Sequence, residues 1–424
     1  MLDIKLIREN PDKITQMIKN RNIIYPLDQL LSLDMERRNI ITKNQKLKEQ
    51  KNQISANIAI LKKQDKNADD MIIKMKKISD DIMTLNSSTR KINSDFHNLL
   101  MRLPNMPDIS VPLGKDSNEN IEIKTYGDVK KFEFKPKNHM DLCLNLDLID
   151  IPRAAKVSGS RFYYLKNELV TLNYALIKFS LDFLNTKGFN LIQPPYMLNR
   201  KAMEGGVILS DFADVIYKIE DEDLYMIATS EHALLSMHMD EIFTSKDLPI
   251  RYAGISPCFR KEAGSHGKDT KGIFRTHQFE KVEQFIFCTP ESSSLEFEIL
   301  LKNSEELMQS LGIPYKIMFL CTGDIGNVSS KTYDIEGWFP SQEKYRELIS
   351  CSNCSDYQSR NLAIRYREKP NDETQFVHTL NSTLLATERT MISIIENYQN
   401  EDGTISIPKV LQPYMNGIRE LNKK

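Results

Sequence analysis

The stretch ISPCFRKEAGSHGKDTKGIFRTHQFEKVEQFIFC, residues 255–288, decides how most of the chain folds. It begins and ends in apolar runs, and its centre is rich in glycine and lysine. Two apolar runs joined by such a loop predict a β-hairpin with a long basic tip. Residues two apart on a strand share a face, so Arg260 and Glu262 are expected to point the same way. Phe279 and Glu283 on the returning strand are expected to share that face.

These four side chains suit a site for a nucleotide and a small charged substrate. An arginine can bind a phosphate or a carboxylate through two parallel hydrogen bonds. A phenylalanine offers a flat surface for a base. A surface hairpin can also carry incidental charges, so the hairpin by itself indicates only a candidate site.

The sequence from about Ile121 onward mixes helical and strand patterns. Short apolar stretches such as EQFIFC, residues 283–288, and YKIMFL, residues 315–320, alternate with turn residues and are typical of strands. A helix is indicated by apolar residues at helical spacing, namely Leu169, Leu172, Leu176, Phe179 and Phe183. The pattern predicts an α+β domain with a mainly antiparallel sheet and flanking helices.

Nearer the N-terminus, two segments repeat apolar residues at coiled-coil spacing. In the first, the repeat is seven residues and consists of Leu33, Ile40, Leu47, Ile54 and Leu61. In the second, steps of three and four alternate through Met75, Ile78, Ile82, Leu85, Thr89, Ile92, Phe96 and Leu99. The polar stretch KKQDKNADD, residues 62–70, lies between them and predicts a turn. The sequence therefore predicts one antiparallel helical hairpin.

The predicted hairpin is basic, although the whole chain has a net charge of -1. Residues 35–103 contain fifteen Lys and Arg against eight Asp and Glu. A lysine-rich surface is expected to contact phosphates. Most heptad repeats, however, form dimerisation or spacer coiled coils. These residues alone leave nucleic-acid binding and a plain structural role equally open.

The segment PNMPDISVPLGKDSNEN, residues 104–120, contains three prolines and many polar residues and is interpreted as a linker. It divides the chain into a domain at residues 1–103 and a second domain at residues 121–424.

Composition indicates a folded protein, since hydrophobic residues make up 40% and charged residues 27% of the chain. The N-terminal sequence has no apolar core of a secretion signal, and we expect a cytoplasmic protein without a membrane span. The six cysteines are expected to be reduced. Cys351 and Cys354 form a CxxC pattern, but this supplies only two of the four ligands of a structural zinc site, so zinc is not expected.

The hairpin stretch resembles motif 2 of class II aminoacyl-tRNA synthetases. Phe259–Glu262 reads F-R-x-E, and EAGSHGKDTKGIFRTHQFEKVE, residues 262–283, is similar to the seryl-tRNA synthetase family through the entire loop. This long match is much more specific than the F-R-x-E pattern alone.

Three further segments resemble the same family and occur in the family's order. GFNLIQPPYM, residues 188–197, resembles motif 1, a helix-then-strand element at the dimer interface, with Pro195 as its proline. HTLNSTLLATERTMISIIENYQ, residues 378–399, resembles motif 3, whose arginine is Arg389. MIATSEHAL, residues 226–234, matches the T-x-E loop beside the amino acid with Thr229, Ser230 and Glu231.

The resemblance implies a seryl-tRNA synthetase, an AMP-forming ligase that activates L-serine with ATP and transfers it to the 3′-terminal adenosine of serine tRNA. The catalytic residues it implies are Arg260, Glu283 and Arg389. The implied serine-binding residues are Thr229, Ser230, Glu231, Arg260, Glu283, Asn381 and Thr383. The implied ATP-binding residues are Arg260, Lys261, Glu262, Thr276, Phe279, Glu347, Leu348, Ile349, Ser350 and Arg389.

The resemblance also implies a magnesium site. YRELISCSNCSDYQSR, residues 345–360, matches the family stretch in which a glutamate and a serine bind Mg²⁺, here Glu347 and Ser350. Both supply oxygen, the ligand that Mg²⁺ prefers. In this family the stretch is used without zinc, in agreement with the interpretation of the CxxC pattern.

Some positions depart from the family pattern. Ser382, Leu384 and Glu388 stand where many relatives have small or neutral residues, and Ile349 replaces a residue that is often small and polar. Neighbours on a helix point about 100° apart, so Glu388 is expected to point away from the ATP that Arg389 binds.

The resemblance gives the helical hairpin a partner. In this family the N-terminal coiled coil binds the long variable arm of serine tRNA, usually across a homodimer. The basic loop of the motif 2 hairpin is expected to lie on the path of the tRNA acceptor end, with Lys261, Lys268 and Lys271.

Three alternatives compete with this interpretation. A synthetase-derived ligase for a carrier protein would not need the basic helical hairpin. A catalytically inactive, tRNA-binding regulator is expected to lack the ATP-binding residues, which this chain retains. A coiled-coil interaction protein would leave about three hundred residues without a role.

Overall fold

The computed structural model describes residues 1–208, 214–263 and 272–423. It divides into two compact units, one made of residues 3–18 and 23–103, and the other of residues 1–2, 19–22 and the chain from Pro104 onward. No helix in the described ranges is both long and apolar enough to cross a lipid bilayer.

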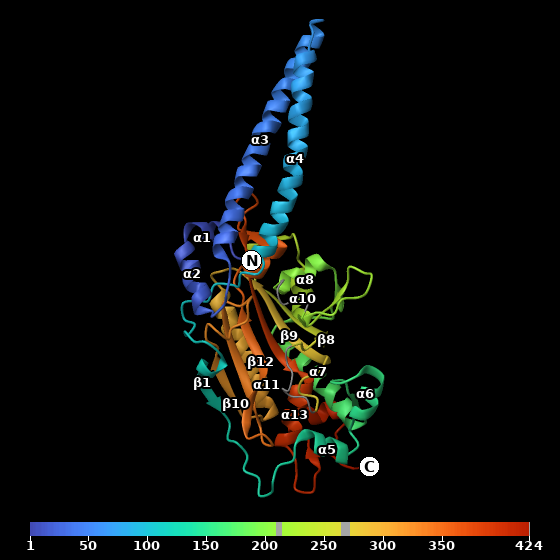
Figure 1. Ribbon diagram of the computed structural model, residues 1–424. Helices are drawn as coiled ribbons and strands as arrows, with labels where there is room; N and C mark the ends of the chain where they lie inside the picture. Colours follow the sequence, from blue (N-terminus) through green and yellow to red (C-terminus); the bar gives the residue numbers. More distant parts are fainter. Residues whose placement is uncertain (209–213, 264–271, 424) are drawn as a thin grey trace. The chain divides into compact units, whose positions relative to one another are not determined.

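The smaller unit contains the predicted helical hairpin. Two short helices, α1 (Ile4–Glu9) and α2 (Pro11–Asn20), precede the long helices α3 (Leu27–Lys63) and α4 (Asp69–Leu100), which run side by side (Figure 1). The predicted turn, residues 62–70, contains the end of α3 and the start of α4. The predicted hairpin is therefore confirmed.

The seam between α3 and α4 is less apolar than the sequence pattern suggests. Ile78, Ile82 and Ile92 are buried as predicted, but so are Asp34 and Asn44. Asp34 forms ion pairs with Arg8, Arg37 and Arg38, at 3.3, 3.8 and 3.0 Å. The Asn44 side chain donates to Asn86 Oδ1 at 2.7 Å. The heptad pattern did not predict these polar contacts.

The larger unit is built on an eight-stranded sheet in the order β1-β10-β11-β12-β15-β9-β8-β4. Neighbouring strands are antiparallel except β8 and β4. In this order the strands are Ile121–Tyr126, Tyr315–Phe319, Lys331–Phe339, Lys344–Asn353, His378–Ala386, Gln278–Cys288, Ile250–Phe259 and Asn190–Ile192. The prediction of an α+β fold with a mainly antiparallel sheet is confirmed.

Three helices cover the sheet and complete the core, namely α7 (Glu168–Thr186), α11 (Ser293–Leu311) and α13 (Thr387–Asn397) (Figure 1). Leu172 and Leu176 of α7 and Leu300 of α11 are fully buried in the same cluster as Ile286 of β9. The apolar faces of these helices therefore pack on the strands that carry the motif residues and hold those strands in position.

Smaller elements surround this core. The short helices are α5 (His139–Asn145), α6 (Ile151–Ser158), α8 (Arg200–Gly206), α10 (Ser230–Ser236), α12 (Tyr357–Leu362) and the 3₁₀ segments η1 (Ser117–Glu119), η2 (Ser245–Asp247) and η3 (Lys409–Met415). The short strands are β2 (Ile149–Asp150), β3 (Tyr164–Leu165), β5 (Met197–Leu198), β6 (Tyr225–Met226), β7 (Ile242–Thr244), β13 (Arg365–Arg367), β14 (Gln375–Phe376), β16 (Ile405–Ser406) and β17 (Glu420–Leu421).

The segment interpreted as a linker, residues 104–120, is packed against the larger unit. The Asn105 backbone N–H donates to the Asn327 carbonyl at 2.8 Å, and its side chain donates to the Cys354 carbonyl at 2.9 Å. Val111 is buried with Leu320. Proline and polar residues suit an ordered extended segment as well as a linker, and composition does not separate the two.

Candidate active site

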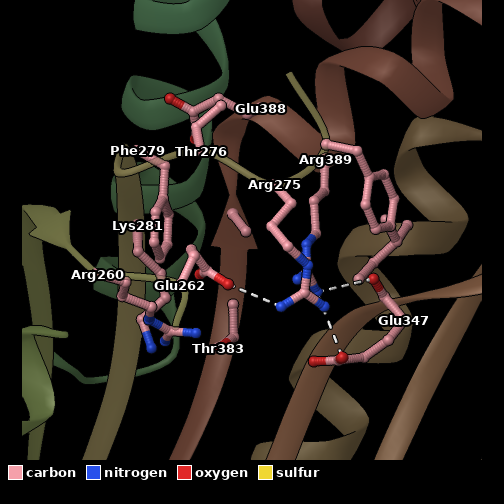
Figure 2. A pocket seen from close by; sticks show the side chains of 13 residues that line it. Arg260, Glu262, Arg275, Thr276, Phe279, Lys281, Glu347, Thr383, Glu388 and Arg389 are labelled. Carbon is pink, nitrogen blue, oxygen red and sulfur yellow. Dashed lines mark hydrogen bonds and ion pairs between the residues drawn. The ribbon is translucent and has the colours of Figure 1, made fainter. Parts of the chain in front are cut away.

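A cleft lies where the motif 2 hairpin, the motif 3 segment and the stretch with Glu347 meet (Figure 2). It is lined by Arg260, Glu262, Phe274, Arg275, Thr276, Phe279, Lys281, Glu347, Leu348, Thr383, Ala386, Glu388 and Arg389. These residues come from three separate segments, 260–281, 347–348 and 383–389, and the sheet brings them together. Eight of them are among the predicted site residues.

One wall of the cleft is built by the motif 2 hairpin. The Arg260 guanidinium lies over the Phe279 ring, 5.0 Å from its centroid, and the Arg260 Nε donates to the Ala228 carbonyl at 3.2 Å. The stacked ring and the backbone contact hold the guanidinium at the edge of the cleft (Figure 2). Its remaining N–H groups are suitably placed for an anionic ligand there.

The expected alternation of Arg260 and Glu262 on one strand is wrong. Strand β8 ends at Phe259, and Glu262 has a φ of 50°, in the left-handed region. The chain therefore turns after the strand, and period-two logic no longer applies. Both residues nevertheless line the cleft, and Glu262 pairs with Arg275 at 2.7 Å.

The opposite wall is organised by Arg389 at the start of α13. Its Nη1 lies 3.1 Å from the Glu347 carbonyl oxygen and 3.4 Å from Glu347 Oε2. Its guanidinium also lies over the Phe274 ring, 4.9 Å from the centroid. The Arg389 charge holds the pKa of Glu347 below its usual range. Figure 2 shows Arg389 facing Glu347 across this side of the cleft.

Glu388 lines the cleft together with Arg389, but its carboxylate bonds groups other than Arg389. Its carboxylate lies at the end of the cleft near Thr276, accepts from the Thr387 hydroxyl at 2.8 Å and the Glu280 N–H at 3.2 Å, and bonds the Tyr163 hydroxyl (Figure 2). Burial raises the pKa of Glu388 to about 7. The 100° between helical neighbours does place Glu388 and Arg389 apart, but the cleft is wide enough to contact both.

A β-bulge brings the two predicted magnesium ligands to one side of the sheet. Ile335 pairs with Ile349, and Glu336 pairs with Glu347, so Leu348 is an extra residue on β12. Residues three apart on a regular strand face opposite sides, and one extra residue restores the same side. Glu347 and Ser350 accordingly line one adjoining acidic cleft, together with Asp334 and Glu336.

A cluster of polar side chains adjoins the cleft at Thr383, which lines it. Glu283 lies opposite Thr383 in the β9–β15 register, and the Thr383 hydroxyl is 3.5 Å from Glu283 Oε2. Glu231 accepts from Gln358 Nε2 at 2.7 Å. Thr229 caps α10, because its hydroxyl oxygen accepts from the Glu231 N–H at 3.3 Å. The charge of Glu283 acts on Glu231, so these two carboxylates lie close together, and each has a threonine hydroxyl beside it.

Four predicted residues have side chains directed elsewhere. Ser230 is buried and donates to the Gly254 carbonyl, and Ile349 packs in the hydrophobic core. Asn381 donates to the Cys354 sulfur at 3.5 Å. Lys261 lies near the Tyr217 ring, with its Nζ 6.0 Å from the centroid. Lys268 and Lys271 lie outside the described residues.

Sequence reasoning missed several residues of the site. Lys281 lies between Phe279 and Glu283, and the period-two rule that selected those two residues would also have selected it. Arg275 was within the quoted hairpin stretch but matched no assigned role. Gln358 reaches Glu231 only through the tertiary fold, so no local signal could have identified it.

Two family models match the chain. The model described as the seryl-tRNA synthetase N-terminal domain matches residues 1–107, and the model described as the tRNA synthetase class II core domain (G, H, P, S and T) matches residues 217–398. The serine–tRNA ligase of Nitrosopumilus maritimus is 52% identical over 421 residues, covering 99% of this chain and 100% of the relative. That of Methanospirillum hungatei is 50% identical, covering 98% of this chain and 99% of the relative.

Solved structures agree with these matches. The seryl-tRNA synthetase of Pyrococcus horikoshii complexed with ATP superposes with a TM-score of 0.91 at 46% identity, covering 100% of both chains. The cytoplasmic serine–tRNA ligase of Naegleria fowleri in complex with AMP gives a TM-score of 0.86 at 33% identity, covering 100% of this chain and 99% of that one.

Proposed function

The chain belongs to the seryl-tRNA synthetase family, and we propose that it activates L-serine with ATP and transfers serine to the 3′-terminal adenosine of serine tRNA. One observation carries this proposal most directly. Arg260 and Arg389 stand on the two sides of one cleft (Figure 2). The hydroxyl of Thr383, which also lines this cleft, lies 3.5 Å from Glu283, and these two residues with Glu231 form the proposed serine pocket. A catalytically inactive protein would have no reason to keep this arrangement.

In the first step, an oxygen of the serine carboxylate attacks the α-phosphorus of ATP, and the bond to the bridging oxygen of the β-phosphate breaks. Seryl-adenylate forms and pyrophosphate leaves. Such a reaction is accelerated mainly by positioning and by charge neutralisation. In this proposal Arg260 binds the α-phosphate and the serine carboxylate, Arg389 binds the outer phosphates, and Phe279 stacks on adenine. All three side chains line the cleft.

Glu347 and Ser350 are proposed to hold Mg²⁺. The bulge at Leu348 places both on one side of the sheet, and their donors are oxygens, as Mg²⁺ prefers. When bound, Mg²⁺ would supply positive charge that neutralises the phosphates. Arg389 also contacts the Glu347 side chain, so its positive charge lies next to the proposed Mg²⁺ site.

In the second step, a hydroxyl of the terminal tRNA ribose attacks the carbonyl carbon of seryl-adenylate. The hydroxyl gives up its proton, AMP leaves with the electrons of the broken bond, and serine becomes esterified to tRNA. We propose that the motif 2 loop, including Lys261, Lys268 and Lys271, guides the acceptor end.

The small unit is proposed to bind the tRNA outside the catalytic cleft. In this proposal residues 1–103 form the tRNA-binding domain, residues 104–120 connect it, and residues 121–424 form the catalytic domain. The hairpin of α3 and α4 would bind the long variable arm, since residues 35–103 carry an excess of positive charge. Charging of serine tRNA for protein synthesis makes the cytoplasm the proposed compartment.

A homodimer through motif 1 is also proposed. Strand β4 forms one edge of the large sheet, and Tyr174 of α7 and Leu191 of β4 are 62% and 44% exposed. Leu191 lies in the segment that resembles motif 1, residues 188–197, and Tyr174 lies on the helix that precedes this segment.

The test is serine-dependent exchange of pyrophosphate into ATP, followed by charging of serine tRNA. We expect exchange with serine well above that with each of the other amino acids, and esterification of serine tRNA. Exchange that is no greater with serine than with the other amino acids would overturn the proposal.

A further inference from the structure

Lys281 is a buried lysine to which the reaction steps above assign no role. Its side chain is 8% exposed, and its Nζ forms an ion pair with Glu283 Oε2. It lies on β9 between Phe279 and Glu283 and lines the cleft (Figure 2). Burying an ammonium group is unfavourable unless its charge is matched, so its position calls for an explanation.

Two carboxylates in the serine pocket supply a reason. Glu283 is 1% exposed, and Glu231 approaches the same pocket from α10. Burial and the nearby Glu283 charge raise the pKa of Glu231 to about 7. Burial likewise raises the pKa of Glu283, while the charges of Lys281 and Arg260 oppose this rise. Without a cation, the two carboxylates could not both remain ionised.

The other groups around Glu283 do not replace Lys281. From α10, His232 has a pKa lowered to about 3 by burial and is therefore uncharged. From β8 and β12, burial raises the pKa of the Cys258 thiol to about 11 and raises the pKa of the Cys351 thiol further, so both are neutral. Thr383 of β15 and Gln358 of α12 supply only uncharged hydrogen-bond donors.

Arg260 is the second cation near the pocket, but it is oriented differently. Its guanidinium stacks on Phe279 and its Nε donates to the Ala228 carbonyl. Among the described residues, Lys281 is the only cation in an ion pair with Glu283. The Arg260 guanidinium therefore keeps N–H groups that can bind the substrate, whereas the Lys281 ammonium group is paired with Glu283.

We propose that Lys281 is a positioning residue that keeps Glu283 as an anionic acceptor for the serine hydroxyl, which leaves Glu231 to bind the serine ammonium group. An ionised carboxylate only accepts hydrogen bonds, so it requires a donor such as the serine hydroxyl. A protonated Glu283 could itself donate a hydrogen bond, so it would no longer require a hydroxyl donor from the substrate. This inference rests on the proposed function and explains how its pocket distinguishes serine from alanine.

The test compares Lys281→Met and Lys281→Arg with wild-type protein. Serine-dependent pyrophosphate exchange is measured from pH 6 to pH 9, together with ATP affinity and thermal stability. We expect Lys281→Met to lower kcat/KM for serine at pH 7 by tenfold or more, mainly through KM. The acidic limb of the pH profile should move up by about 1 to 3 pH units, because a contacting opposite charge lowers a carboxyl pKa by that amount.

Two comparisons separate this role from a merely structural one. Lys281→Arg should restore the acidic limb toward its wild-type position, and Lys302→Met, an exposed lysine of α11, should leave it unmoved. If Lys281→Met does not fold, the double change Lys281→Met with Glu283→Gln decides, because without the Glu283 charge the loss of Lys281 should make the protein no worse than Glu283→Gln alone.

An unmoved acidic limb in folded Lys281→Met would overturn the role of Lys281 while wild-type exchange still depends on serine. A double variant clearly worse than Glu283→Gln would overturn it as well. Wild-type exchange that does not depend on serine would instead overturn the proposed function.

Discussion

The helical hairpin and the catalytic cleft are built in opposite ways. Residues of α3 and α4 contact each other along a continuous seam, and each turn of helix repeats the same kind of contact. The cleft instead joins single side chains from distant segments, such as Arg260, Glu347 and Arg389. The hairpin should therefore tolerate individual changes but depend on its length and charge. The cleft should be sensitive to single substitutions.

Shortening the hairpin should give the largest effect. Replacing residues 45–85 by a short Gly- and Ser-rich turn keeps the Asn44–Asn86 contact and the base of the hairpin, where the Tyr25 hydroxyl donates to the Leu99 carbonyl at 2.8 Å. We expect charging of serine tRNA to fall by roughly a thousandfold or more, because the proposed contacts of the hairpin with tRNA phosphates would be lost. Serine-dependent pyrophosphate exchange should remain within about twofold of wild type, since activation takes place in the other unit.

Complete removal of residues 35–103 should give the same separation. The intact protein's affinity for tRNA should also fall steeply as salt increases, because lysine–phosphate contacts release counterions. Normal charging by the shortened protein would contradict a tRNA-binding role for the hairpin.

Arg389→Ala should be the most damaging single change in the cleft. It removes the cation that we propose binds the outer phosphates, and it leaves Glu347 without its 3.4 Å partner. We expect kcat/KM for ATP to fall by about a hundredfold to a thousandfold. This corresponds to about 3 to 4 kcal/mol of activation free energy, which the charge-assisted contact supplies. Steady-state exchange at varied ATP measures this. Arg346→Ala, which removes another arginine that lies over Phe274, is the matched control.

The buried carboxylate of Glu388 should make the stability of the catalytic unit depend on pH. Its pKa in the folded protein is about 7, against an ordinary value of 4.5. Between these values the folded state holds a proton that the unfolded state has released, so the free energy of unfolding falls as pH rises. The fall should be about 2 to 3 kcal/mol between pH 5 and pH 8.

Glu388→Gln should remove this part of the pH dependence. Trp338 is the only tryptophan and lies on β11, so its fluorescence during urea unfolding reports the catalytic unit. Glu231 titrates in the same range in both proteins, and the difference between the two curves isolates Glu388. Parallel curves for wild type and Glu388→Gln would show that Glu388 is ionised throughout.

Thr383→Ala should have a smaller and more selective effect. The Thr383 hydroxyl faces Glu283. Its loss leaves one fewer polar group that can form a hydrogen bond with the serine hydroxyl. We expect the ratio of kcat/KM for serine to kcat/KM for alanine to fall by about tenfold. This corresponds to the cost of about 1 to 2 kcal/mol for leaving a buried polar group without a hydrogen bond. Glu283→Gln should reduce serine activation far more than ATP affinity. Equal losses with serine and alanine in Thr383→Ala would show that its hydroxyl does not read serine.

The two regions also differ in how well the sequence predicts them. The ends of α3 and α4 follow from the heptads and from the polar turn at residues 62–70, because helix periodicity is a local property. In the cleft, resemblance to a known family selected Arg260, Phe279 and Arg389, all of which line it. Hydrophobic periodicity alone could not have predicted that these three residues lie in one cleft, because it describes each element separately.

The missed features share one physical cause, which is that they depend on register or on tertiary contacts. The bulge at Leu348, which aligns Glu347 with Ser350, depends on pairing with β11. The turn after Phe259 changes the direction of Glu262, and the buried position of Glu388 depends on Tyr163. None of these has a signal within a few residues of the position concerned.

The smallest predicted effect tests whether the hairpin tolerates single changes. Asn44 is 7% exposed in the seam, and its Oδ1 has no hydrogen-bond partner among the described residues. A buried unsatisfied carbonyl is unfavourable, whereas a leucine would add apolar contact at the same position. We expect Asn44→Leu to stabilise the hairpin by about 1 kcal/mol, which slows amide hydrogen exchange in the middle of α3 about fivefold. Asn52→Leu, on the exposed face of the same helix, should leave exchange unchanged. Faster exchange in Asn44→Leu would mean that the contact with Asn86 fixes the pairing of the two helices, and that the hairpin, like the cleft, depends on single side chains.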